Sequence, residues 1–299
     1  MGQLFKVLKV SGSDARSFLQ GQLTQDVARL AHTPAALAAW CNAKGRVIAV
    51  MRMIVASGGD GIGLVVPAAL AESLLQRLLR YKFRASVDFA IAGDEWGALA
   101  LSREDDIAVL AALGLLPREG RNAAGHTRNL VAVDTGAVPR CIEVYGPVSA
   151  VQESGLISAR RLTDVEWQLA LIGAGIPLIR AATSEKYTPH MLNLDCLGAI
   201  SFSKGCYTGQ EVVARTQHLG SSKRRLMHFQ TNSASAAVGD KLQLEGRDVG
   251  DVINVIGGQL LAVVPVELHG QTLQVHGTLA SPVALPYAVG TGVASGGAS

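Results

Sequence analysis

The sequence predicts an α+β protein that ends in a small β-barrel. Two observations carry this prediction. Apolar, β-rich runs and helix-like segments alternate twice between residues 4 and 145, with hairpins between them. After residue 223 the pattern changes to short strands separated by glycine turns, which is typical of a barrel. The composition agrees, because 48% of the 299 residues are apolar and 17% are charged, as in folded globular chains.

The first part of the chain predicts two α+β halves. Periodicity and β-branched runs predict strands at 4–10, 47–55, 62–66 and 83–91, then at 96–101, 130–134 and 141–145. Helices are expected between them, one after Pro67 and one capped by Ser102. The apolar stretch at 35–42 is expected as the approach to a turn at 43–46. This order resembles two ferredoxin-like halves. A further helix opens at Thr163, which has capping-box spacing to Glu166, and carries Trp167.

The helix after Pro67 ends in basic residues. Arg77, Arg80 and Lys82 follow its leucines, at the end where the helix dipole favours cations. Such an end could attract a phosphate or RNA. We favour the simpler interpretation, in which the cations complement the dipole and face water.

One octad, Lys204-Gly205-Cys206-Tyr207-Thr208-Gly209-Gln210-Glu211, gathers unusually varied chemistry between two glycines. It offers a cation, a thiol, an aromatic ring, an amide and a carboxylate. Glycines let the backbone take positive φ or approach a ligand closely. We expect a short strand at 200–202 before it, and a strand or the start of a helix at 212–214 after it. A glycine-hinged loop between rigid elements is a common place for function.

Together with Pro189, Asn193-Leu194 and Arg215, the octad closely resembles the signature of the YgfZ family. The resemblance recurs at 12–26, 43–46, 81–87 and 167–177. Members of that family are folate-binding relatives of the glycine-cleavage T-protein, and they are linked to iron–sulfur protein maturation and tRNA modification. The resemblance implies a T-protein-like fold, with two ferredoxin-like halves around a central pocket and a C-terminal β-barrel. We therefore expect segments at 1–135, 136–222 and 223–287, followed by a flexible tail at 288–299.

The resemblance also implies a tetrahydrofolate site. In the family, aromatic residues at the positions of Trp167 and Phe5 contribute to the folate pocket. A pterin needs an apolar or aromatic face, polar groups at its edge and a cation for its acidic tail. Tyr207 could add a face, Gln210 and Glu211 edge contacts, and Lys204, Arg215 or Lys223 the cation. Gly205 and Gly209 would shape the loop.

Cys206 is the candidate reactive group, with Lys204 beside it. A nearby cation favours the thiolate and raises reactivity. Three interpretations stay open: a nucleophile, a redox or metal-relay thiol, or an inert cysteine. Nucleophilic catalysis needs a positioned base, and the sequence does not show that His190 or His218 reaches the thiol.

An ordinary aminomethyltransferase activity is disfavoured. In the T-protein, acidic residues follow the glycine turn that corresponds to Gly45, and one of them is important for catalysis. This chain has Ile48 and Ala49 there, so no carboxylate at those positions can orient a reacting nitrogen. The alternative function, a folate-dependent transferase or demethylase, would need acid–base groups from elsewhere.

The hypothesis is a cytoplasmic, monomeric, tetrahydrofolate-binding accessory protein for iron–sulfur cluster assembly or repair, which supports tRNA modification indirectly. Its partners would be folate and, transiently, iron–sulfur enzymes or assembly factors. A binding scaffold with an incidental thiol is a third option. Several classes are disfavoured. No cysteine–histidine spacing predicts a metal site, no apolar run predicts a membrane span, and a net charge of +3 without an RNA-reading motif argues against direct nucleic-acid binding.

Overall fold

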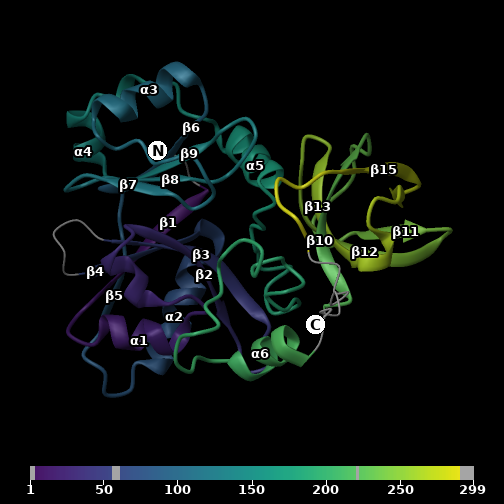
Figure 1. The fold of residues 1–299 in the computed structure, drawn as a ribbon, viewed down its shortest axis with the longest axis horizontal. Helices are drawn as coiled ribbons and strands as arrows, with labels where there is room; N and C mark the ends of the chain where they lie inside the picture. The colour runs from purple at the N-terminus through teal and green to yellow at the C-terminus, as the bar shows by residue number, and fades with distance from the viewer. Residues whose placement is uncertain (1–3, 56–60, 220–221, 290–299) are drawn as a thin grey trace, which may run out of the picture.

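The computed structural model describes residues 4–55, 61–219 and 222–289. Two antiparallel sheets lie one above the other, and a closed barrel stands beside them (Figure 1). The predicted α+β class with a C-terminal barrel is therefore confirmed. Residues 290–299 of the expected tail lie outside the described residues.

The first sheet contains five strands in the order β2-β3-β4-β1-β5. Four of them, β3, β4, β1 and β5, have the order of a ferredoxin-like sheet, and β2 extends its edge. Helices α1 and α2 lie on the side of this sheet that faces away from the second sheet (Figure 1). The elements are β1 Phe5–Ser11, α1 Ala15–Gln22, β2 Ala35–Cys41, β3 Val47–Val55, β4 Gly61–Pro67, α2 Ala71–Tyr81 and β5 Asp88–Ile91, with a short 3₁₀ helix at Val27–Ala31.

The second sheet repeats the connectivity of the first. Its order, β6-β9-β8-β7, corresponds to β1-β4-β3-β2, and a helix follows the first and the last strand of each set. The expected segment boundary at residue 135 falls between β8 and β9, which pair with each other. The elements are β6 Trp96–Leu101, α3 Glu104–Ala112, β7 Ala124–His126, β8 Val131–Asp134, β9 Ile142–Pro147 and α4 Val148–Glu153.

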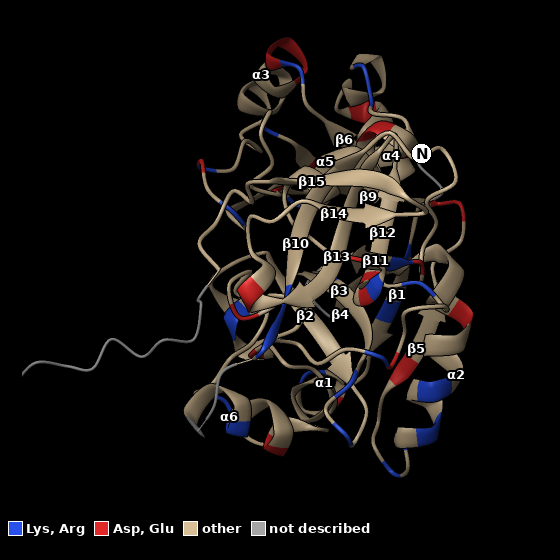
Figure 2. Ribbon diagram, turned by 90° about the vertical axis from the view of Figure 1, so that its right-hand side faces the viewer, with Lys and Arg blue, Asp and Glu red and all other residues tan. Residues whose placement is uncertain are grey.

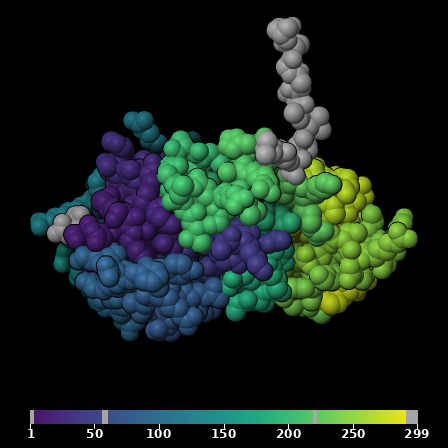
Figure 3. All heavy atoms as spheres, turned by 90° about the horizontal axis from the view of Figure 1, so that it is seen from below, coloured from purple at the N-terminus to yellow at the C-terminus, as the bar shows by residue number. Residues whose placement is uncertain are grey.

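Helix α5, Asp164–Gly173, begins at the predicted capping box of Thr163 and Glu166. A long irregular segment then leads to α6, Gln210–Leu219, and on to the barrel. Seen from below, the green surface of this part of the chain lies between the purple N-terminal region and the barrel (Figure 3). The barrel strands are β10 Arg224–Thr231, β11 Lys241–Leu244, β12 Arg247–Ile256, β13 Gln259–Pro265, β14 Leu273–Val275 and β15 Thr278–Val283.

Four local predictions were wrong. Ser102 does not cap α3, because the helix begins after Arg103 and the Ser102 hydroxyl donates to the Arg140 carbonyl at 2.9 Å. The apolar stretch at 35–42, expected only as the approach to a turn, forms strand β2. No strand forms at 200–202, where the chain is irregular. The strand expected from Phe83 begins at Asp88, because Phe83 adopts φ +42° and starts a turn. Apolar composition alone does not distinguish a strand from a packed loop.

Candidate functional site

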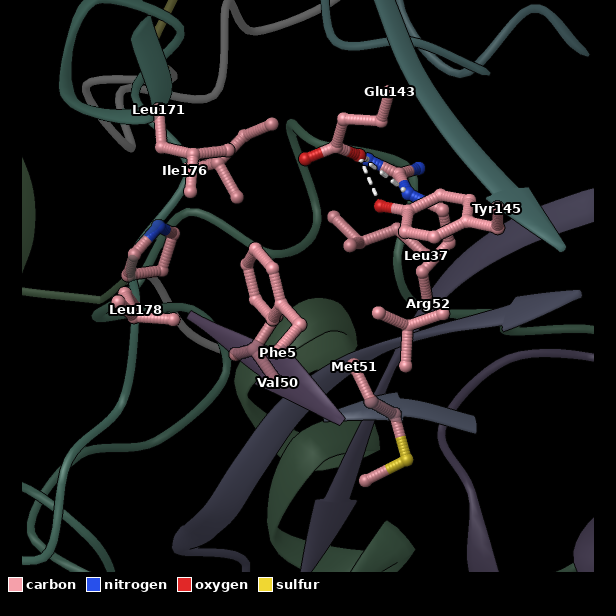
Figure 4. Close-up of a pocket in the computed structure, with 12 residues that line it drawn as sticks. Phe5, Leu37, Val50, Met51, Arg52, Glu143, Tyr145, Leu171, Ile176 and Leu178 are labelled. Atoms are coloured by element: carbon pink, nitrogen blue, oxygen red, sulfur yellow. Dashed lines mark hydrogen bonds and ion pairs between the residues drawn. The ribbon is translucent and has the colours of Figure 1, made fainter. Parts of the chain in front are cut away.

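A cavity lies between the two sheets, closed on one side by α5 and the segment that follows it. It holds about 360 Å³ of empty space, its open mouth included. Figure 4 shows a polar group of side chains at one side and apolar side chains at the other. The lining residues are Phe5, Leu37, Val50, Met51, Arg52, Val65, Glu143, Tyr145, Leu171, Ile176, Pro177 and Leu178.

Glu143 is the centre of the polar side. Its Oε2 accepts hydrogen bonds from the Arg52 Nε at 3.0 Å and from the Tyr145 hydroxyl at 2.6 Å. The second Arg52 nitrogen lies 2.8 Å from the same oxygen. Oε1 accepts from the Trp167 indole nitrogen at 3.0 Å. Because Arg52 and Glu143 are only 4% and 2% exposed, this ion pair between β3 and β9 joins the two sheets inside the protein.

Burial and charge act together on these groups. Burial alone would lower the pKa of Arg52, but the Glu143 carboxylate opposes it, and the net pKa is raised above its ordinary value. Burial, and then the Glu143 charge, raise the pKa of Tyr145 well above its ordinary value. Tyr145 is therefore a neutral phenol that donates to the carboxylate, and Arg52 stays charged.

Asn122 extends the hydrogen-bond network of Arg52 and Glu143 beyond the cavity. Its Oδ1 accepts from the Arg52 guanidinium at 3.1 Å, and its Nδ2 donates to the Leu197 carbonyl at 2.8 Å. Leu197 belongs to the irregular segment that leads to the octad. A continuous hydrogen-bonded chain thus links the Glu143 carboxylate to that segment.

The structure brings together the two predicted pocket aromatics. The rings of Phe5 and Trp167 have centroids 5.1 Å apart with an interplanar angle of 60°. Phe5 lines the cavity, whereas Trp167 is fully buried behind it and directs its N–H to Glu143. Trp167 therefore orients the Glu143 carboxylate and packs against the ring of Phe5.

The octad lies at a different place. Among the described residues that line the cavity, none belongs to the octad and none is Arg215. Lys204 explains why, because its ammonium donates to three backbone carbonyls in the last turn of α1 and just after it: Gln20 at 2.6 Å, Leu23 at 2.7 Å and Gln25 at 3.1 Å. Burial lowers the pKa of Lys204 to about 8. Lys204 thus fastens the octad to the first half of the protein.

The glycines of the octad differ from each other. Gly209 has φ +81°, and a Cβ there would lie 2.4 Å from the Asn42 carbonyl oxygen. Gly45, in the turn opposite, has φ +68°, and its Cβ would lie 2.8 Å from the Val212 Cβ. The octad and this turn therefore meet backbone to backbone. A Cβ on Gly205 would meet no described atom within 4 Å.

Among the remaining octad side chains Tyr207 is buried, whereas the others are partly or fully exposed. Cys206 is exposed, and of the four cysteines, all of them described, it is the only one that is. Tyr207 is buried, and its ring centroid lies 5.2 Å from the Lys204 ammonium. The Gln210 amide oxygen accepts from the Tyr207 N–H at 3.3 Å. Glu211 and Arg215 pair at 3.0 Å on the exposed face of α6.

The residues that the sequence analysis missed are Arg52, Tyr145, Glu143 and Asn122. A usable signal was present for two of them. Arg52 interrupts the apolar run of β3, and Glu143 interrupts that of β9. A charge inside a strand that is otherwise buried requires a partner of opposite charge. Two such strands with opposite charges are therefore expected to face each other and pair.

Metal-binding clusters and membrane-spanning helices are both absent from the described residues. No group of three or more His, Cys, Asp or Glu side chains in that part of the chain could hold a metal ion. No helix there is both long and apolar enough to cross a membrane.

Comparison with solved structures defines the class of fold. The aminomethyltransferase T of the glycine cleavage system from Bartonella henselae matches 94% of this chain and 83% of its own, with a TM-score of 0.69 at 18% sequence identity. The fold is therefore that of the glycine-cleavage T-protein. No protein-family model matches the chain.

The closer relatives are found by sequence. The tRNA-modifying protein YgfZ of Colwellia psychrerythraea is 33% identical over 229 residues, which are 74% of this chain and 68% of the relative. YgfZ of Escherichia coli is 34% identical over 241 residues, 79% of this chain and 73% of the relative. The chain belongs to the YgfZ family.

Proposed function

We propose that the cavity between the sheets binds the pterin head of a reduced folate. The observation that carries this proposal is the Glu143 carboxylate, paired with Arg52 at the wall of a cavity whose opposite wall is apolar. The pterin edge presents N–H groups, and the Glu143 Oε1, which accepts one hydrogen bond from Trp167, has a lone pair left for one of them. Phe5, Leu171 and Ile176 offer apolar surface for the ring faces.

The cavity is small as it stands. The centre of a water molecule can reach only about 30 Å³ of it, so the walls would have to move apart to admit a bicyclic head. The aminobenzoyl-glutamate tail would extend out of it. The fit of the residue types supports folate without requiring any metal.

A binding role is preferred to one-carbon transfer. Ile48 and Ala49 are buried apolar residues of β3, and their neighbours Val50 and Met51 line the cavity. Glu143 is already committed to three donors, so it is a poor base for a transfer reaction. We propose that the chain is an accessory protein for iron–sulfur cluster assembly or repair. It would then support tRNA modification indirectly, which agrees with the name of its relatives, tRNA-modifying protein.

The octad would serve this role from the surface. Cys206 is exposed beside the anchored Lys204, which suits a thiol that meets a protein partner better than one that attacks a bound folate. We propose transient contact with iron–sulfur enzymes or assembly factors, in the cytoplasm and as a monomer.

The folate proposal is tested by calorimetric titration of the purified protein with tetrahydrofolate and 5-formyltetrahydrofolate. We expect saturable binding that Phe5→Ala and Glu143→Gln each weaken at least about tenfold. Glu153→Gln, an exposed carboxylate on α4, is the matched control and should bind normally. Equal affinity in all four proteins would exclude the cavity, and turnover of a methylamine donor with tetrahydrofolate would favour the transferase instead.

The accessory role is tested in cells that lack the protein. Cys206→Ala should fail to restore the activity of iron–sulfur enzymes, while its melting temperature and folate affinity stay normal. Cys196→Ala, a less exposed thiol, should restore activity. Full rescue by Cys206→Ala would remove the thiol from the function and leave a binding scaffold.

A further inference from the structure

The turn after α2 holds an aromatic ring out into water. The Phe83 side chain is 90% exposed, and its backbone adopts φ +42°. A bulky residue in the left-handed region is an outlier, because its Cβ is crowded by the backbone. The fold thus accepts a strained backbone at a residue whose side chain packs on almost nothing. Such outliers gather at sites of function.

The turn is held in place by groups other than the Phe83 ring. The Ala85 N–H donates to the Lys82 carbonyl at 2.8 Å, which closes the turn. The Ser86 N–H donates to the Asp14 carboxylate at 2.8 Å, and the Asp14 N–H donates back to the Ser86 carbonyl at 3.1 Å. The position of Phe83 is therefore fixed, although its side chain is not needed to fix it.

The exposed side chains next to Phe83 in the chain are apolar or basic. The Asp14 and Asp88 carboxylates at this turn already bind the Ser86 N–H and Lys82. Leu79 is 41% exposed and Tyr81 is 42% exposed, and Arg80 and Arg84 are exposed beside them. Residues 77–84 contain four basic side chains and no acidic one. Figure 2 shows the blue positions along the last turns of α2 and in the loop below it. We call the set Leu79, Arg80, Tyr81, Phe83 and Arg84 the α2 tip.

We propose that the α2 tip is a docking surface for a protein partner whose own surface is acidic and carries an apolar pocket for Phe83. Aromatic residues and arginine are the side chains that most often dominate the binding energy of protein interfaces. Two arginines without an acidic residue in the segment select an acidic partner and speed its approach. The α2 tip lies on the face of the first sheet away from the cavity (Figure 1), so this inference does not depend on folate binding.

RNA is the other partner that basic and aromatic residues attract, and the geometry favours it less. Platforms for single-stranded RNA stack successive bases on several free rings. Here the Tyr81 ring packs edge-on against Trp40, with centroids 5.8 Å apart. Phe83 is thus left as a single projecting ring, which suits insertion into a pocket of a protein.

The first experiment crosslinks the full-length protein in cells. Benzoylphenylalanine is introduced by Phe83→benzoylphenylalanine or, as a matched control, by Val138→benzoylphenylalanine, since Val138 is 82% exposed on another loop. We expect one protein, acidic in composition, to be captured at position 83 and not at 138. Equal capture at both positions, a basic partner, or an RNA adduct would overturn the proposal.

The captured protein is then purified and titrated by calorimetry against four forms of this chain. We expect Phe83→Ala and the Arg80→Glu/Arg84→Glu pair to weaken binding at least about tenfold, and Val138→Ala to leave it unchanged. Phe83→Gly separates docking from folding, because glycine accepts positive φ without strain. It should raise the melting temperature and still lose the partner. Unchanged affinity in Phe83→Ala would refute the docking role, and a normal folate titration of the same variant would show that the cavity is unaffected.

Discussion

Arg52 and Glu143 are charged residues in strands that are otherwise apolar, and each can be buried because the other neutralises it. Replacement of both by apolar residues is often harmless in proteins, whereas removal of one leaves a charge without a partner in a medium of low dielectric. Their pairing also affects what the cavity can bind, since Arg52, Tyr145 and Trp167 together hold the Glu143 carboxylate in one orientation.

The first prediction concerns Arg52→Met. The Glu143 charge would then keep only the Tyr145 and Trp167 donors, and we expect the free energy of unfolding to fall by about 3–5 kcal/mol in urea denaturation. The control is Arg103→Met, because Arg103 forms exposed pairs only and its loss should change stability by less than about 0.5 kcal/mol. A similar small loss for Arg52→Met would mean that the ion pair adds little to the fold.

Two buried imidazoles predict sensitivity to acid. The His190 Nε2 donates to the Gln217 amide oxygen at 3.1 Å, and the His228 Nε2 donates to the Gln259 amide oxygen at 2.7 Å. Burial lowers the pKa of both below its ordinary value. The unfolded chain therefore binds protons at higher pH than the native protein does, so acid favours unfolding.

We accordingly expect the free energy of unfolding to decrease as the pH falls from about 7.5 to about 5, through the ordinary histidine range. The His190→Gln/His228→Gln protein should show a flatter dependence when urea unfolding is measured at both pH values. His32→Gln, at an exposed position, serves as the control. An equally steep loss in the double variant would assign the acid sensitivity to other groups.

At the scale of elements, α6 depends on the close approach between the octad and the turn at 42–46. Gly209→Ala would place a Cβ 2.4 Å from the Asn42 oxygen on a backbone with positive φ. We expect it to destabilise the protein by more than about 1 kcal/mol in thermal unfolding. Gly205→Ala is a matched control in the same octad, and it should be tolerated because its Cβ would enter open space. Equal effects of the two would argue against a backbone contact there.

The elements that the sequence predicted best are those whose signal is local. The capping box at Thr163 and the buried run of β3 follow from spacing and composition within one segment. Strand β2 was missed, because its apolar residues do not alternate and its pairing partner is set by the sheet. The turn at Phe83 was missed because its backbone is held from Asp14, about seventy residues away in the chain.

At the scale of the whole molecule, the barrel supports one wall of the cavity. Asn254 of β12 accepts from the Leu178 N–H at 3.0 Å and donates to the Leu178 carbonyl at 2.7 Å. Leu178 lines the cavity, whereas Asn254 does not. The barrel therefore positions the cavity wall through two hydrogen bonds that resemble a strand pairing.

The fourth prediction follows from this link. Asn254→Ala should weaken tetrahydrofolate binding several-fold in calorimetric titration, because it leaves two backbone groups of Leu178 without partners and frees the wall to move. Gln259→Ala, in the same barrel but at the hydrogen bond to His228, should leave the affinity unchanged. An unaltered affinity in Asn254→Ala would mean that the cavity wall holds its position without the barrel.

The candidate site shows where sequence reasoning reaches its limit. Phe5 and Trp167 could be assigned to one pocket, and the structure brings them together. The sequence analysis grouped the octad with them, yet Lys204 binds carbonyls near α1 and the other octad side chains stay away from the cavity. That Tyr207, Gln210 and Glu211 contact the pterin and Arg215 the tail of a folate stays a prediction. Residues that are far apart in sequence line one pocket only when the fold brings their segments together.

The matching order of the two sheets also bears on how such a protein could have arisen. If the two sets of strands descend from one duplicated unit, the unit that came first had no opposite sheet to face. A lone arginine or glutamate in its apolar strand would then have been exposed on a partnerless surface or lost. The two halves carry one charge each of a single pair. Neither half could therefore be separated from the other without leaving its charge unpaired on an apolar sheet face.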